Sequence, residues 1–142
     1  MAKVLVIDDE EGIRNLLDTL LTRKEYTVVL AESGRKGLDL FRRERPDVIV
    51  LDLKMPEMDG MAVLQQVRNL NPSQPVIILT GAGLPQAEER LRAFGVSEYV
   101  EKEFSLHRLG DALKRALGAS RSATLAKAVT IKGTQKPKTG RD

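Results

Sequence analysis

The chain has 142 residues, of which 42% are hydrophobic and 30% are charged, and it contains no cysteine. These values are typical of one globular domain with a substantial core, and the lack of thiols excludes a disulfide framework and a thiolate metal site. The formal net charge of +3 is unevenly placed, because residues 119–142 hold six basic side chains against one acidic, whereas residues 1–118 hold 17 against 19. We therefore expect a nearly neutral folded domain over residues 1–118 and a basic, flexible tail over residues 119–142.

Strand and helix patterns alternate along the predicted domain. Five short apolar runs, several rich in β-branched residues, predict strands, which are Lys3–Ile7, Tyr26–Leu30, Asp47–Asp52, Pro75–Thr80 and Val96–Val100. Apolar residues at helical spacing follow each run and predict five helices. Capping and breaking residues mark the helix ends, and they are Ser33, Asp59-Gly60, Asn71-Pro72, Gly95, Ser105 and Gly118.

Strict alternation of strands and helices predicts a parallel sheet with helices on both faces. Asp8 and Asp9 follow the first predicted strand, Asp52 ends the third, Thr80 ends the fourth and Lys102 follows the fifth. All five side chains are then expected at the same edge of the sheet. The strand order 2-1-3-4-5 makes the first and third strands neighbours and brings the three carboxylates together at the switch point. We predict a doubly wound α/β fold with this order.

The residues at this edge suit phosphoryl transfer. Carboxylates in one pocket repel one another unless a divalent cation, commonly Mg²⁺ beside phosphate, or the ammonium group of Lys102 offsets them. An aspartate beside Mg²⁺, a lysine and the Thr80 hydroxyl can accept a phosphoryl group as an acyl phosphate. Taken singly, each residue has a simpler interpretation. Asp8, Asp9 and Glu10 could cap a helix, Asp52 could be a loop aspartate, and Lys102 a surface lysine. Thr80 and Tyr99 could be ordinary strand residues.

The polar residues lie in stretches with a distinctive order. These stretches are Val6-Ile7-Asp8-Asp9-Glu10, Asp52-Leu53-Lys54-Met55-Pro56 with Asp59-Gly60, Leu79-Thr80-Gly81, and Tyr99-Val100-Glu101-Lys102-Glu103-Phe104. Together they resemble the receiver domain of the bacterial two-component response regulators, over roughly residues 2–118. The resemblance implies a flavodoxin-like fold and phosphorylation of an aspartate.

The resemblance also implies a metal site and an acceptor. Asp52 is implied to be the phospho-acceptor and to share Mg²⁺ with Asp9, which is a direct ligand. Asp8 is implied to act partly through water, and the backbone carbonyl group of Lys54 is implied to supply a further ligand.

Lys102 is implied to contact the phosphoryl group. Thr80 is implied to hydrogen-bond this group and to move on activation, while Tyr99 is implied to be an aromatic switch that turns inward with it. By the same analogy, the small Gly81 leaves access to the phosphoryl group open. Glu103 replaces the proline that the family usually has after this lysine, often with a cis peptide. A cis bond before a non-proline residue costs about 3 kcal/mol, so we expect a trans peptide here.

As a receiver, the protein would take its phosphoryl group from a phosphohistidine on a histidine kinase or phosphotransferase. It would be a signalling domain that catalyses at most its own phosphorylation and dephosphorylation. It would signal to a protein partner through the face of the fourth helix, fifth strand and fifth helix, and a phosphorylation-dependent homodimer is left open.

Two other functions are weighed beside the receiver. The first is an aspartate-dependent phosphohydrolase, although such enzymes typically carry a second aspartate two residues after the nucleophile, where this chain has Lys54. The second is a DNA-binding regulator that uses the basic tail. The tail has no aromatic residue and no recognition motif, so a solvated tail or linker is favoured over nucleic-acid binding. No apolar run approaches membrane-spanning length, and the cytoplasm is the default location.

Overall fold

The computed structural model describes residues 1–81, 84–96, 98–102 and 107–118. The strands are β1 (Lys3–Ile7), β2 (Thr27–Ala31), β3 (Val48–Asp52), β4 (Val76–Thr80) and β5 (Glu98–Glu101). The helices are α1 (Glu11–Arg23), α2 (Gly34–Glu44), α3 (Gly60–Leu70), α4 (Leu84–Ala93) and a helix over residues 107–118. The predicted peptide geometry at Glu103, the Ser105 cap and the tail over 119–142 lie outside the described residues.

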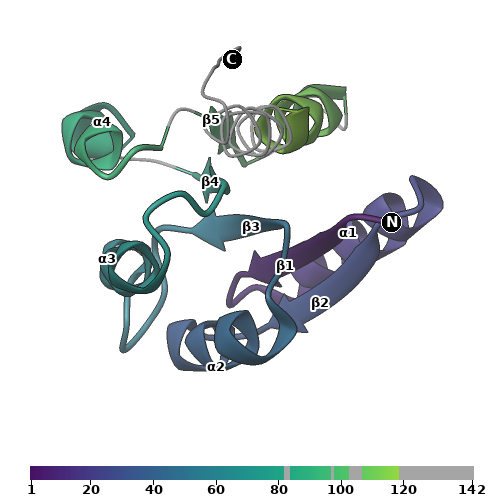
Figure 1. Cartoon of the computed structure of the whole chain (residues 1–142), viewed down its shortest axis with the longest axis horizontal. Coiled ribbons are helices and arrows are strands. Elements are labelled where there is room, and N and C mark those ends of the chain that lie inside the picture. Colours follow the sequence, from purple (N-terminus) through teal and green to yellow (C-terminus); the bar gives the residue numbers. More distant parts are fainter. Residues whose placement is uncertain (82–83, 97, 103–106, 119–142) are drawn as a thin grey trace, which may run out of the picture.

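The five strands form one parallel sheet in the order β2-β1-β3-β4-β5, which confirms the predicted topology (Figure 1). All residues of β3 and β4 are buried, as expected for inner strands that are covered on both faces. In the register, Leu5 of β1 pairs with Ile49 of β3, and Leu51 of β3 pairs with Ile78 of β4. The carboxyl ends of β1 and β3 are therefore neighbours.

Helices cover both faces of the sheet (Figure 1). Successive side chains of a strand point to opposite faces, so Leu5 and Ile7 pack in one apolar cluster while Val4 and Val6 pack in the other. The first cluster contains buried residues of α2, α3 and α4, and the second contains buried residues of α1 and of the helix over 107–118. Each helix thus buries its apolar stripe against one face of the sheet.

Local signals in the sequence account for most helix ends. The Ser33 hydroxyl accepts a hydrogen bond from the Lys36 backbone N–H at 3.1 Å, and the Asp59 carboxylate accepts one from Ala62 at 2.9 Å. Both residues therefore cap their helices as predicted. Gly95 ends the turn after α4 with a φ of +81°, a conformation that glycine adopts without strain.

The fifth strand begins later than predicted, at Glu98 and not at Val96. The backbone N–H of Val96 donates to the carbonyl oxygen of Leu91 at 3.0 Å, so Val96 belongs to the turn that closes α4. Its side chain is buried like that of a strand residue, so an apolar β-branched residue at this position was wrongly predicted to begin the strand. Within the described ranges, no helix is long and apolar enough to cross a membrane.

Candidate functional site

Three aspartates meet at the carboxyl edge of the sheet. Asp8 follows β1 and Asp52 is the last residue of the neighbouring strand β3, and one carboxylate oxygen from each of Asp8, Asp9 and Asp52 lies within 4.8 Å of the others. Asp9 is exposed, whereas Asp8 and Asp52 are only 0% and 2% exposed. The fold therefore places two carboxylates in the interior, beside a third at the surface.

Backbone groups hold the two buried carboxylates in position. Oδ1 of Asp8 accepts a hydrogen bond from the Glu10 N–H at 2.8 Å, and Oδ1 of Asp52 accepts one from the Lys54 N–H at 3.2 Å. Arg14, one turn into α1, donates from its guanidinium group to the Asp8 carbonyl oxygen at 2.8 Å. These contacts orient the second oxygen of each carboxylate towards the shared pocket.

Gly60 lets the loop after β3 fold back against the site. A Cβ atom at this position would overlap the Asp52 carbonyl oxygen and lie 2.6 Å from the Leu53 Cα atom, so no other residue fits without displacing backbone. The Gly60 N–H donates to the Leu53 carbonyl oxygen at 2.8 Å. The glycine thus anchors the start of α3 beside Asp52.

Lys102 joins the carboxylates from the end of β5. Its Nζ atom lies 3.3 Å from Oδ2 of Asp8, 3.3 Å from Oδ2 of Asp52 and 2.7 Å from Oε1 of Glu10. Its backbone N–H donates to the Thr80 carbonyl oxygen at 2.7 Å, which ties the lysine to the end of β4. One ammonium group is therefore shared among three carboxylates.

The charges of the site are only partly balanced. Burial, and then the nearby Asp8 carboxylate, raise the pKa of Asp52 from 3.8 to about 6, although Lys102 acts in the opposite direction. Burial also raises the pKa of Asp8. For Lys102, burial by itself lowers the pKa, but the ion pairs with Glu10, Asp8 and Asp52 outweigh it and raise the pKa. The pocket has a shortage of positive charge.

A divalent cation fits this donor set. Oδ2 of Asp8 is fully buried and accepts no hydrogen bond from the described residues, although the Lys102 ammonium group lies 3.3 Å away. A buried carboxylate oxygen that shares one ammonium group with two other carboxylates is poorly compensated, and a hard cation with oxygen ligands would supply the missing positive charge. Asp8, Asp9 and Asp52 are the side chains placed to hold such an ion.

Comparison with known proteins identifies the family. A sequence model described as "Response regulator receiver domain" matches residues 4–114. The chain belongs to this receiver domain family. It is therefore a signalling domain of two-component systems, which confirms the resemblance and the doubly wound fold that were predicted from the sequence.

Individual relatives and a solved structure agree with this family. The chain is 33% identical over 115 residues to sporulation initiation phosphotransferase F of Bacillus subtilis, and the match covers 81% of this chain and 93% of that protein. It is 40% identical over 124 residues to the transcriptional regulatory protein GlrR of Escherichia coli, covering 87% of this chain and 28% of that protein. A solved response regulator receiver domain protein from Clostridium thermocellum superimposes with a TM-score of 0.82 at 33% identity, covering 87% and 99% of the two chains. The chain spans about half or less of the length of the relatives named as transcriptional regulators.

The two residues predicted to form the receiver's switch lie on adjacent strands. Thr80 ends β4 at the same edge as Asp52 and is buried. Tyr99 lies on β5, half-buried beside the apolar cluster under α2, α3 and α4, and its hydroxyl group donates to the Val96 carbonyl oxygen at 2.8 Å. The structure therefore places Tyr99 against the turn that follows α4.

Glu10 is the contact of the receiver site that the sequence analysis missed. The sequence offered it only as one residue of an acidic run that could cap the start of α1, and assigned it no part in the site. In the structure it makes no side-chain cap and turns to Lys102. Arg14 was missed for a similar reason, because a charged residue on a helix is ordinarily solvated.

Proposed function

We propose that this receiver accepts a phosphoryl group on Asp52 in the presence of Mg²⁺ and changes conformation as a result. The observation that carries the proposal is the buried Asp8–Asp52 pair with the Lys102 ammonium group 3.3 Å from a carboxylate oxygen of each. This arrangement provides an acceptor oxygen together with a fixed positive charge for the oxygens of an incoming phosphoryl group. The receiver domain would span residues 1–118, and residues 119–142 would be a tail.

The transfer is a substitution at phosphorus. A carboxylate oxygen of Asp52 attacks the phosphorus atom of a phosphohistidine, a new O–P bond forms, and the P–N bond breaks with its electron pair left on the imidazole ring of the donor. Lys102 binds a phosphoryl oxygen, and the Thr80 hydroxyl group donates a hydrogen bond to another. Mg²⁺ held by Asp8, Asp9, Asp52 and the Lys54 carbonyl group would offset the charge of the phosphoryl oxygens.

Phosphorylation would change the surface on the side of the molecule that carries β5. Movement of Thr80 towards the phosphoryl group would open space beside β5, and Tyr99 would exchange its hydrogen bond to Val96 for a more inward position. This would reshape the surface formed by α4, β5 and the helix over 107–118, where a protein partner or a second copy of the receiver would bind. The donor would be a histidine kinase or a phosphotransferase, and relatives named as transcriptional regulators make an output in gene control the favoured one.

A small phosphodonor tests the proposal without knowledge of the cognate kinase. We expect acetyl phosphate with Mg²⁺ to add the mass of one phosphoryl group to the whole chain, and expect EDTA or Asp52→Asn to abolish the addition. Asp39→Asn is a matched control, because Asp39 is an exposed carboxylate on α2. Phosphorylation of the Asp52→Asn variant would overturn the acceptor assignment. Steady turnover of p-nitrophenyl phosphate would instead support the hydrolase.

A further inference from the structure

A groove lies at the opposite edge of the sheet from the phosphorylation site. It is lined by the carboxyl-terminal ends of α2 and α3 and by the loops that lead into β3 and β4, and its lining residues are Phe41, Arg42, Arg45, Pro46, Leu70, Asn71 and Gln74. Its volume is about 480 Å³. In a parallel sheet these loops lie at the amino edge of the strands, so the groove is remote from Asp52.

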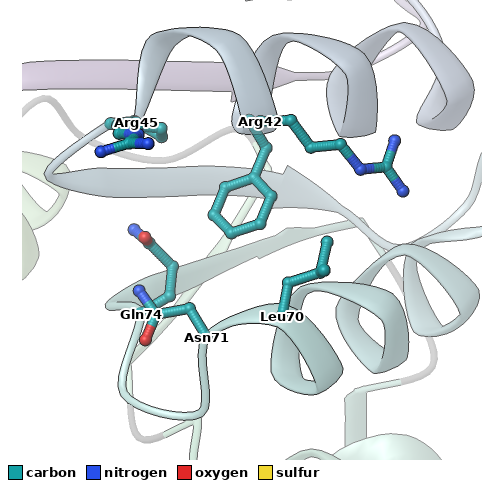
Figure 2. A pocket seen from close by; sticks show the side chains of 7 residues that line it. Arg42, Arg45, Leu70, Asn71 and Gln74 are labelled. Atoms are coloured by element: carbon teal, nitrogen blue, oxygen red, sulfur yellow. The ribbon is translucent and has the colours of Figure 1, made fainter.

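The groove has an apolar side and a polar side (Figure 2). Phe41 and Pro46 are buried beneath it, while Leu70 is 54% exposed and points from α3 towards α2. The amide side chains of Asn71 and Gln74 lie at the end of the groove that faces Arg45 (Figure 2). A binding partner would therefore need an apolar group next to acceptor oxygens.

The charge of the groove is positive. Arg42 and Arg45 are exposed, and neither guanidinium group forms an ion pair or hydrogen bond with any described residue. Among the described residues, no acidic side chain lines the groove. The nearest acidic groups in sequence, Glu44 and Asp47, are already bound by Lys3. The two arginines are thus available for carboxylates from outside the chain.

We propose that this groove binds an acidic segment of a partner protein, in which an apolar side chain stands beside aspartate or glutamate. The apolar side chain would rest on Leu70 and Phe41, and the carboxylates would pair with Arg42 and Arg45. A peptide segment suits the groove better than a small molecule, because the groove is open to solvent and would leave much of a small ligand uncovered. Binding at the amino edge does not require the phosphoryl group, so the segment would bind in both signalling states.

The test uses the whole ¹⁵N-labelled chain and three fluorescent peptides: alternating glutamate and leucine, alternating lysine and leucine, and alternating glutamate and serine. We expect the first peptide alone to shift amide signals of residues 41–45, 70–71 and 73–74, and to bind more weakly as salt is added. Arg42→Glu and Arg45→Glu together should weaken binding by about tenfold.

Two matched variants separate this site from general charge or hydrophobic effects. Arg43→Glu is the control for Arg42→Glu alone, because it makes the same charge change on the same helix, but Arg43 pairs with Asp39 and does not line the groove. Leu70→Ser is matched by Leu16→Ser, because Leu16 is 46% exposed on α1. We expect only Leu70→Ser to weaken binding. The proposal fails if no peptide binds, if the lysine peptide binds equally well, or if Arg43→Glu weakens binding as much as the groove variants.

Phosphorylation provides an independent arm of the experiment. Asp52→Asn, and beryllofluoride with Mg²⁺ on the wild type, should leave the affinity for the glutamate–leucine peptide unchanged. A change of more than about threefold would show that the groove responds to the phosphorylation site, which would contradict binding in both states. Failure of phosphorylation at Asp52 would leave the peptide result unaffected, so the two proposals can fail separately.

Discussion

Replacing Asp52 by asparagine should stabilise the protein when Mg²⁺ is absent. The raised pKa means that the folded structure disfavours the charged carboxylate, and a rise from 3.8 to about 6 corresponds to about 3 kcal/mol at neutral pH. Asparagine removes this charge and keeps an oxygen for the Lys54 N–H. It also removes one carboxylate partner of Lys102, which still has Asp8 and Glu10. We therefore expect a net gain of about 1–3 kcal/mol in the free energy of unfolding.

The assay is urea unfolding followed by far-ultraviolet circular dichroism at pH 7.5 in EDTA. Asp39→Asn is the control, because that carboxylate is exposed and pairs loosely with Arg43 at 3.8 Å, so its loss should change stability by less than about 1 kcal/mol. At pH 4 the gain from Asp52→Asn should disappear, since the native carboxyl group is then protonated. The reasoning is refuted if the variant is less stable than the wild type in EDTA, or if the control gains as much.

Three further predictions follow from the same site. The pKa of Asp52 is higher in the folded than in the unfolded chain, so in EDTA the stability of the wild type relative to Asp52→Asn should fall as pH rises from about 4 to 6. Urea titrations at several pH values measure this slope. Saturating Mg²⁺ should flatten or reverse it. Gly60→Ala should lower the free energy of unfolding by more than about 2 kcal/mol, measured by thermal unfolding, because its Cβ atom would overlap backbone. Gly12→Ala on α1 is the control and should be neutral or stabilising, because a Cβ atom there would have nothing within 4 Å. Equal effects would contradict the close approach at Gly60. Glu10→Gln should remove one of the three carboxylates that share Lys102 and speed phosphorylation by acetyl phosphate about two- to fivefold in a stopped time course. A slower reaction would show that this carboxylate assists instead of competing.

The sequence predicted the sheet and the polar cluster at its carboxyl edge together, and for one reason. A strand buried on both faces must be almost wholly apolar, so Asp52 at the end of β3 and Thr80 at the end of β4 stood out as polar groups at strand ends. Parallel strands bring such ends to one edge, so the pairing of Asp8 with Asp52 could be expected before any coordinates were known. This pattern brought the polar residues together, whereas the individual roles of metal ligand, phospho-acceptor and phosphoryl-binding lysine came from the resemblance to receiver domains.

Contacts made by long surface side chains could not be predicted in this way. Glu10 had several directions open to it at the start of α1, and only the position of β5 decided that it would meet Lys102. The Tyr99 hydroxyl group binds the Val96 carbonyl oxygen because the turn after α4 passes beside it. Neither contact leaves a periodic signal in the sequence.

The groove at the amino edge shows the same division. Arg42 and Arg45 read as ordinary charged residues near the end of a helix, and Leu70 reads as one more apolar residue of α3. Only the packing of α2 beside α3 brings these residues together around one groove and leaves Leu70 exposed.

The sequence by itself determined which residues are buried in strands and which polar groups end those strands, because a strand covered on both faces must be almost wholly apolar. Tertiary structure alone decided which surface side chains meet, because such residues are free in the chain until two elements are packed together.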